Sequence, residues 1–322
     1  MPRDQKTTSS LIYGPVPSRR LGRSLGVDIV PYKTCTYDCI YCQIGRTPQT
    51  TTERKPYIPA ERIISELQNK LRSRVRPDFV TVGGSGEPCL HSGIGEIILR
   101  IKEMTDVPVA VLTNGALLWS PEVRGALLSA DVVLPSLDAF DDSSFQKINR
   151  PHPDISFETM IQGLADFRSV YSGRIWLEIF IIKGVNDTED AMAAFGPHIA
   201  AINPDRIHVN TAVRPPAEKD ARQVSEEKLQ RLAEKLDPRA EVIAEFSAQS
   251  RGGNEEDMNQ QILEMLSRRP CTAQDIAAGL GLPLEAVEHQ VTELAGSKTI
   301  QTRRSNGRIY YFRPAEKTSD YQ

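Results

Sequence analysis

Three cysteines, Cys35, Cys39 and Cys42, lie within one eight-residue stretch of the chain, C-T-Y-D-C-I-Y-C. Three thiolates brought to one point can hold three irons of a cubane iron–sulfur cluster, whereas four thiolates close such a cluster for electron transfer. With three, one iron keeps an open position for another ligand. The spacing therefore predicts a [4Fe-4S] cluster whose open iron binds and activates a second molecule.

A structural zinc site is the alternative interpretation of the same cysteines. Zinc in such sites takes four ligands, and no fourth Cys or His lies close by in the sequence. Cys89 or His208 would have to be supplied by the fold. The zinc site therefore requires one of these two residues beside the three thiols.

The spacing resembles the CxxxCxxC signature of the radical S-adenosylmethionine (SAM) enzymes. The resemblance implies that the open iron chelates the amino and carboxylate groups of SAM. One electron from the cluster would then cleave SAM to methionine and a 5′-deoxyadenosyl radical, which abstracts hydrogen from a substrate. The implied cofactors are the [4Fe-4S] cluster and SAM, and the implied partner is a reductase or a flavodoxin- or ferredoxin-type electron donor.

An N-terminal run, GPVPSRRLGRSLG at residues 14–26, carries Arg19, Arg20 and Arg23 among prolines and glycines. Arginines bind carboxylate or phosphate through a planar fork, although a solvated basic loop is the simpler interpretation. Together with YCQIGRT at residues 41–47, this run resembles the wyosine-synthase-related iron–sulfur oxidoreductases. That relationship would imply a modified tRNA base, but the C-terminal region described below differs from the tRNA enzymes, so the tRNA substrate is not transferred.

Short apolar runs alternate with amphipathic stretches along the first 246 residues, which predicts a parallel sheet with right-handed crossovers. The expected strands are residues 26–30, 79–83, 109–112, 131–135, 175–182 and 206–209, with 241–246 as a seventh run at an edge. Helical spacing of apolar residues is evident in 59–71, 94–101, 160–167 and 229–236. Six units are too few for a closed eight-stranded barrel, so we expect a partial (β/α)6 TIM-like barrel, which is also the fold of the family.

Polar or glycine-rich motifs follow nearly every expected strand, at the end where barrel active sites lie. They are the cysteine loop, residues 83–88, residues 113–115, residues 136–138, residues 183–187 and residues 210–211. A tight turn would explain each motif alone. Their shared position at one rim predicts an active site.

The resemblance assigns cofactor contacts to some of these residues. A GGEP-like element binds the amino group of SAM in the family, and Gly83, Gly84, Gly86 and Glu87 match it, although Ser85 interrupts the usual spacing. The other expected contacts are Ser136 and Asp138 with the ribose or carboxylate, Tyr41 with the adenine, and Asn114 and Asn210 with the pocket. The alternatives are a helix N-cap for Asp138, a left-handed turn for Asn114 and loop packing for Tyr41. Glu178 and Asn210 face either solvent or the barrel lumen, and the lumen is the expectation.

The composition changes after residue 246. Residues 247–257 are polar and predict a linker, and residues 258–314 predict a winged helix-turn-helix domain: three helices, the second capped by Thr272, then a hairpin around Asn306-Gly307. Seven Lys and Arg oppose five acids between residues 258 and 313, a weak excess for a phosphate binder. The domain thus predicts either nucleic-acid binding or protein docking.

The whole-chain composition sets the remaining limits. The chain has 322 residues, a net charge of −3 and five cysteines, three of them clustered, which does not indicate a disulfide framework. Residues 1–10 lack the apolar core of a secretory signal, and no run reaches the length of a membrane span, so we expect a cytoplasmic protein. No base–nucleophile pair identifies a catalytic residue, and the sequence does not distinguish among small-molecule, peptide and RNA substrates. A second hypothesis is a redox or iron sensor whose output is the winged helix.

Overall fold

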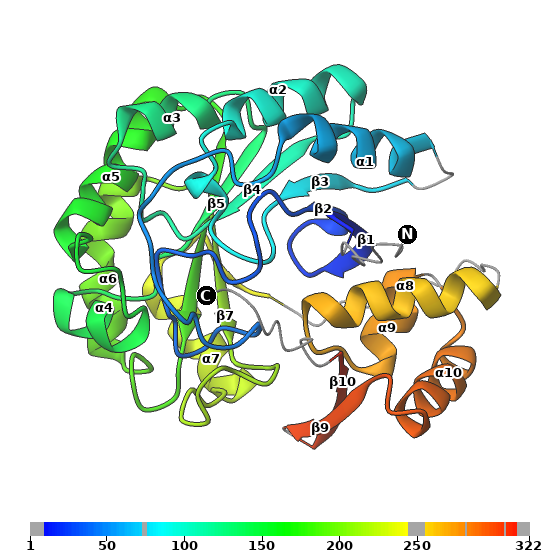
Figure 1. The fold of residues 1–322 in the computed structure, drawn as a ribbon. Helices are drawn as coiled ribbons and strands as arrows, with labels where there is room; N and C mark the ends of the chain where they lie inside the picture. Colours follow the sequence, from blue (N-terminus) through cyan, green and yellow to red (C-terminus); the bar gives the residue numbers. More distant parts are fainter. Residues whose placement is uncertain (1–9, 73–75, 244–254, 281, 306, 314–322) are drawn as a thin grey trace.

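The computed structural model describes residues 10–72, 76–243, 255–280, 282–305 and 307–313. One eight-stranded sheet runs in sequence order from β1 to β8 (Figure 1). Its strands are β1 (Ile12–Ser18), β2 (Gly22–Val27), β3 (Phe79–Val82), β4 (Val109–Thr113), β5 (Val132–Pro135), β6 (Arg174–Ile181), β7 (Arg206–Thr211) and β8 (Ala240–Val242).

The strands from β2 to β8 are parallel, and only β1 is antiparallel to its neighbour β2. No ladder joins β1 to β8 among the residues that the structure describes, so the sheet is curved but open. The mixed α/β fold with a parallel sheet agrees with the expected partial barrel, and its strand ends converge on one rim.

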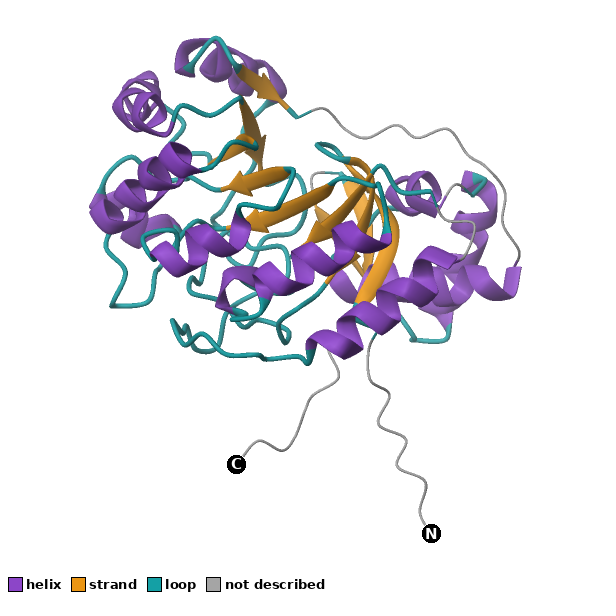
Figure 2. Cartoon of the chain, turned by 90° about the horizontal axis from the view of Figure 1, so that it is seen from above, coloured by secondary structure: helices purple, strands orange, loops and turns teal. Residues whose placement is uncertain are grey.

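Seven helices of the barrel lie on the outer side of this curved sheet (Figure 2). They are α1 (Ala60–Arg72), α2 (Ile94–Met104), α3 (Pro121–Leu127), α4 (Asp142–Ile148), α5 (Phe157–Val170), α6 (Glu189–Ile202) and α7 (Glu226–Leu236). Each buries one apolar stripe, as Ile63 and Leu67 do in α1 and Ile97 and Ile101 do in α2. These stripes join in one large core cluster between the helices and the sheet. No helix in the described ranges is both long enough and apolar enough to cross a bilayer.

The N-terminal run differs from the sequence-based expectation. Residues 12–27 form the antiparallel pair β1–β2, whereas the sequence predicted a basic loop followed by a strand at 26–30. The glycines and prolines, which are typical of a loop, lie here in β1 and β2, where glycine allows the two strands to pack closely. A Cβ on Gly26 would lie 2.1 Å from Cζ of Tyr13, so glycine is required where the β1 side chain crosses β2.

The C-terminal unit consists of α8 (Glu255–Arg268), α9 (Ala273–Leu280), α10 (Leu284–Gly296) and the hairpin β9 (Gln301–Ser305) and β10 (Arg308–Phe312). Thr272 caps α9 as expected, since its Oγ1 accepts the Asp275 N–H at 3.1 Å. The first hairpin strand spans residues 301–305, and Lys298, just before it, has a φ of 61°.

Two boundary predictions fall partly outside the described residues. Most of the expected linker, residues 247–254, lies outside them, and its last three residues belong to α8. The expected edge strand at 241–246 corresponds to β8, which ends at Val242, while residues 244–246 are not described.

The C-terminal unit packs on the free side of the barrel, against β1 (Figure 1). Val16 of β1 belongs to the same buried cluster as Met265 of α8 and Ile276 of α9. The Tyr310 hydroxyl of β10 donates a hydrogen bond to the Val213 carbonyl, just after β7, at 2.6 Å. The open side of the barrel is therefore covered by the chain's own C-terminal elements.

Candidate active site

All three clustered cysteines line one cavity of about 350 Å³ at the rim of the sheet. Five further residues with expected cofactor contacts line it too: Tyr41, Gly84, Gly86, Ser136 and Asn210. The other four residues with expected cofactor contacts are not among those that line the cavity: Gly83, Glu87, Asn114 and Asp138. The structure thus brings together residues that are up to 175 positions apart in the sequence.

Each cysteine sulfur has one nitrogen donor beside it. The Nδ2 of Asn114 lies 3.6 Å from Sγ of Cys35, and the Nδ2 of Asn149 lies 3.5 Å from Sγ of Cys39. The ammonium of Lys33 lies 3.3 Å from Sγ of Cys42. Such donors stabilise thiolates and tune the potential of a cluster that they hold.

Burial opposes ionisation of these thiols when no metal is bound. Burial, with the nearby Glu87 carboxylate, raises the pKa of the Cys35 thiol to about 12. Burial and Asp138 raise the pKa of Cys39 well above its ordinary value. A metal that binds these sulfurs must displace their protons.

The glycine-rich loop after β3 is paired with the start of the cysteine loop. The Lys33 N–H donates to the Ser85 carbonyl at 2.7 Å, and the Glu87 N–H donates to the Thr34 carbonyl at 2.9 Å. A Cβ on Gly86 would lie only 2.1 Å from the Thr34 oxygen. The two loops can approach this closely because residue 86 is glycine.

Ser85, which interrupts the GGEP-like spacing, fixes the same loop from behind. Its N–H donates to Oδ1 of Asp28 at 2.8 Å, and its hydroxyl donates to Oδ2 at 2.9 Å. The Gly83 carbonyl accepts a hydrogen bond from the Tyr13 hydroxyl at 2.8 Å. The extra residue therefore has a structural function, and the loop presents Gly84 and Gly86 to the cavity.

The Glu87 carboxylate is directed toward β4 rather than into the cavity. It accepts hydrogen bonds from the Thr113 hydroxyl at 2.7 Å, the Asn114 N–H at 2.7 Å and the Cys89 N–H at 2.9 Å. Burial raises its pKa above the ordinary value. With both oxygens engaged, Glu87 connects the ends of β3 and β4, and its direct contact with a ligand stays a prediction.

Asp138 has a similar supporting position. Its carboxylate accepts hydrogen bonds from the Tyr41 hydroxyl, from Nδ2 of Asn149 at 3.0 Å and from the Phe180 N–H at 3.0 Å. Burial raises its pKa to about 6, although these donors favour the ionised form. It is not a helix cap either, because Asp141 caps α4. Asp138 instead holds Tyr41 and the Asn149 amide beside Cys39.

Tyr41 stacks on Phe180, with ring centroids 4.0 Å apart and an interplanar angle of 13°. Both rings line the cavity. Asn114 also has a defined partner, since its Nδ2 donates to the Thr36 hydroxyl at 2.7 Å. These contacts hold the cysteine loop against the ends of β4, β5 and β6.

Neither candidate fourth zinc ligand joins the three thiols. Cys89 is fully buried and donates to the Thr113 hydroxyl at 3.4 Å, and His208 lies with Nε2 3.2 Å from Oε1 of Glu241. Neither residue lines the cavity. Among the described residues, no three Cys, His, Asp or Glu side chains are gathered as a single ion requires. Thiolates bound to one zinc ion lie about 3.8 Å apart, because each Zn–S bond is about 2.3 Å long. A cubane cluster holds its thiolates further apart. The three cysteines therefore suit the cluster better than a single zinc ion.

Charged side chains line the rest of the cavity, and most are cationic. Glu178 is the one acid in the lining; it pairs with Arg20 and accepts a hydrogen bond from Nδ2 of Asn210 at 3.0 Å. Burial alone would raise the pKa of Glu178, but Arg20 and Asn210 hold it below its ordinary value. As expected, Glu178 and Asn210 face the lumen.

Some residues of this site were not predicted from the sequence, among them Lys33, Asn149, Arg214 and Arg269. Lys33 lies two positions before Cys35, so a search around the cysteine motif would have found it. Arg214 is an isolated arginine just after the expected sixth strand. Asn149 and Arg269 carry no local signal, because only the tertiary fold brings them to the cysteine loop.

The sequence comparisons agree with this geometry. The profile of the radical SAM superfamily matches residues 29–196. A UPF0026 protein of Helicobacter pylori strain J99 is 32% identical over 315 residues, which cover 95% of this chain and 98% of that protein. A Brachyspira hyodysenteriae protein described as GTPase Obg is 35% identical over 313 residues, and a UPF0026 protein of Methanocaldococcus jannaschii is 34% identical over 212. The chain spans only 46% and 66% of those two relatives.

Among solved structures, a radical SAM methyltransferase from Sphaerobacter thermophilus has the same fold, with a TM-score of 0.51 and 17% identity. The match covers 68% of this chain and 66% of the methyltransferase. The protein therefore belongs to the radical SAM superfamily of enzymes and, within it, to the UPF0026 proteins.

Proposed function

We propose that Cys35, Cys39 and Cys42 hold a [4Fe-4S] cluster and that SAM binds at its open iron. One observation carries this proposal: the three thiols line the same cavity at the rim of the sheet, and each has a nitrogen donor beside it. When bound, these cofactors supply reductive cleavage of SAM to a 5′-deoxyadenosyl radical that abstracts hydrogen from the substrate. The protein binds, orients and shields them.

The lining residues suggest how SAM is oriented. The backbone of Gly84 and Gly86 is the proposed contact for the methionyl amine, because no side chain separates it from the cavity. Ser136 and Asn210 offer polar groups for the ribose or the carboxylate. The Tyr41 ring, held by Phe180, is the proposed contact for the adenine.

Glu87, Asn114 and Asp138 are proposed as positioning residues. Each engages the loops that carry the cysteines or the glycines, through the hydrogen bonds described above. They fix the cysteine loop, while neighbouring groups make the contacts with SAM.

We also infer that the C-terminal unit is a winged helix, because its order of three helices and a hairpin fits that motif. Its third helix, α10, exposes Glu285, Glu288 and Glu293 and carries no Lys or Arg, which disfavours base readout by that helix. The likeness to the wyosine-related subgroup names no substrate by itself.

The alternative is a sensor in which the cluster is a switch. A sensor needs no SAM-sized cavity beside the thiols, so the lining favours catalysis. Protein reconstituted without oxygen, reduced by dithionite or a flavodoxin-type donor and given SAM is expected to release 5′-deoxyadenosine, measured by liquid chromatography. Fully clustered, reduced protein that releases none would overturn the proposal and favour the sensor.

A further inference from the structure

The cavity beside the cysteines carries a large excess of positive charge. Among the residues that the structure describes, five cationic side chains line it, against the single acid Glu178: Arg19, Arg20, Lys33, Arg214 and Arg269. Arg20 pairs with Glu178, and Lys33 donates to Cys42 and, at 2.7 Å, to the Gly45 carbonyl. The other three cations of the lining are Arg19, Arg214 and Arg269.

Arg214 is buried with an incomplete set of partners. Its side chain is 9% exposed, its nearest acid is Asp275 at a long 3.6 Å, and its Nε has no hydrogen-bond acceptor. Burying an arginine whose donors are unpaired is costly. An anionic ligand in the cavity would supply the missing acceptor.

Arg19 adds a second uncompensated charge. Its side chain has neither a hydrogen bond nor an ion pair to any residue that the structure describes, and it lines the same cavity. Burial, together with the charges of Arg214 and Arg20, lowers its pKa to about 10. The two guanidinium groups therefore repel each other, and the Glu178 carboxylate offsets only part of this repulsion at Arg19.

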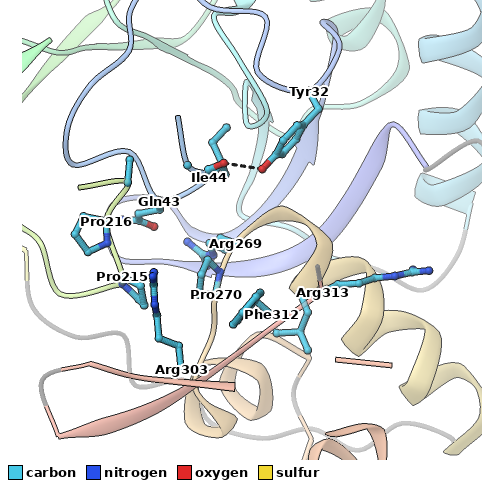
Figure 3. A pocket seen from close by; sticks show the side chains of 13 residues that line it. Tyr32, Gln43, Ile44, Pro215, Pro216, Arg269, Pro270, Arg303, Phe312 and Arg313 are labelled. Carbon is cyan, nitrogen blue, oxygen red and sulfur yellow. Dashed lines mark hydrogen bonds between the residues drawn. The ribbon is translucent and has the colours of Figure 1, made fainter. Parts of the chain in front are cut away.

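The C-terminal unit supplies the third cation. Arg269 directly follows α8, and Met265 of α8 lines the same cavity. A second cavity of about 330 Å³ shares Arg269, Gln43 and Ile44 with the first and adds Arg303 and Arg313, with no acid in its lining. Figure 3 shows this second cavity between the barrel loops and the C-terminal elements.

The proposed cofactors do not remove this excess. An oxidised cubane with three thiolates carries one net negative charge and SAM one net positive charge, so together they are neutral. We propose that Arg19, Arg214 and Arg269 form the binding site for a phosphate group of the substrate, enclosed between the barrel and the C-terminal unit. The assignment of the phosphate group to the substrate, rather than to a cofactor, rests on the proposed function, in which the cluster and SAM are the cofactors.

Phosphate fits the three arginines better than a carboxylate does. A carboxylate has two oxygens and one charge, which a single guanidinium fork satisfies. A phosphate monoester has three free oxygens and up to two charges, so it engages several forks together. The C-terminal unit then helps to bind the substrate, which accounts for its packing against β1.

The test measures binding of inorganic pyrophosphate to the full-length reconstituted protein by titration calorimetry. Arg19→Gln and Arg214→Lys are each expected to weaken binding by about tenfold or more, because each removes charge-assisted hydrogen bonds. Arg231→Gln, on the exposed side of α7, is the matched control and should leave the affinity unchanged. Circular dichroism establishes that each variant is folded, and Arg214→Lys keeps the buried charge.

Citrate and a short single-stranded RNA serve as competing probes. Citrate is expected to bind at least about tenfold more weakly than pyrophosphate. The proposal is overturned if pyrophosphate does not bind, if it binds both folded variants as tightly as the wild type, if citrate binds equally well, or if only the RNA binds. Arginine-dependent pyrophosphate binding by protein that fails to cleave SAM supports the site and removes only the proposed function.

Discussion

Replacing Cys35, Cys39 or Cys42 singly by serine is expected to abolish both the cluster and the release of 5′-deoxyadenosine. In the proposed site three thiolates are the whole protein ligand set, since neither Cys89 nor His208 lines the cavity. Loss of one leaves two, too few to hold a cubane. Iron and sulfide should fall from about four of each per chain to near zero, measured by chemical analysis after anaerobic reconstitution.

Cys89→Ala provides the matched control for these variants. Cys89 is a buried thiol near the same rim, and its side chain donates a hydrogen bond to the Thr113 hydroxyl. Its removal should leave the iron content and the 5′-deoxyadenosine yield close to those of the wild type. A cluster that persists in any of the three serine variants, or that disappears in Cys89→Ala, would contradict the assigned ligand set.

Gly86→Ala is expected to produce the second largest effect, through the backbone rather than through a ligand. The added Cβ would lie 2.1 Å from the Thr34 oxygen, a distance that forces the glycine-rich loop and the cysteine loop apart. The hydrogen bonds from Glu87 to Thr34 and from Lys33 to Ser85 would then be lost. We expect the iron content after reconstitution to fall at least severalfold and the free energy of unfolding to fall by about 1–3 kcal/mol.

Gly125→Ala is the appropriate control for that substitution. Gly125 lies in α3 with nothing within 4 Å of an added Cβ, so alanine should be neutral or slightly stabilising there. Normal iron content in Gly86→Ala would show that the contact between the two loops does not position the thiols. Equal losses in both glycine variants would indicate a general folding defect instead.

Much of the barrel could be predicted because its signals are local. Apolar runs of strand length and helical stripes such as Ile94, Ile97, Ile98 and Ile101 each report on one element. The β1–β2 pair could not be predicted in this way. Its glycines and prolines have the composition of a loop, and only the contact between Gly26 and the Tyr13 ring reveals why a strand needs them.

The site shows the same division between local and tertiary information. The meeting of the cysteines with Gly84, Ser136 and Asn210 follows from strand order, because parallel strands end at one rim. The direction in which the Glu87 and Asp138 carboxylates point does not follow from strand order. Both carboxylates follow strands as predicted, yet backbone and side-chain donors from neighbouring strands turn them away from the cavity.

The proposed cluster leaves one iron open for SAM, because the three cysteines hold the other three irons. Mössbauer spectroscopy of protein reconstituted with ⁵⁷Fe examines this open iron itself, with spectra taken before and after SAM is added. About a quarter of the iron signal is expected to shift when SAM binds, because one iron of the cubane gains new ligands. A spectrum unchanged by saturating SAM, or a stoichiometric zinc ion at the three thiols in place of iron, would contradict it.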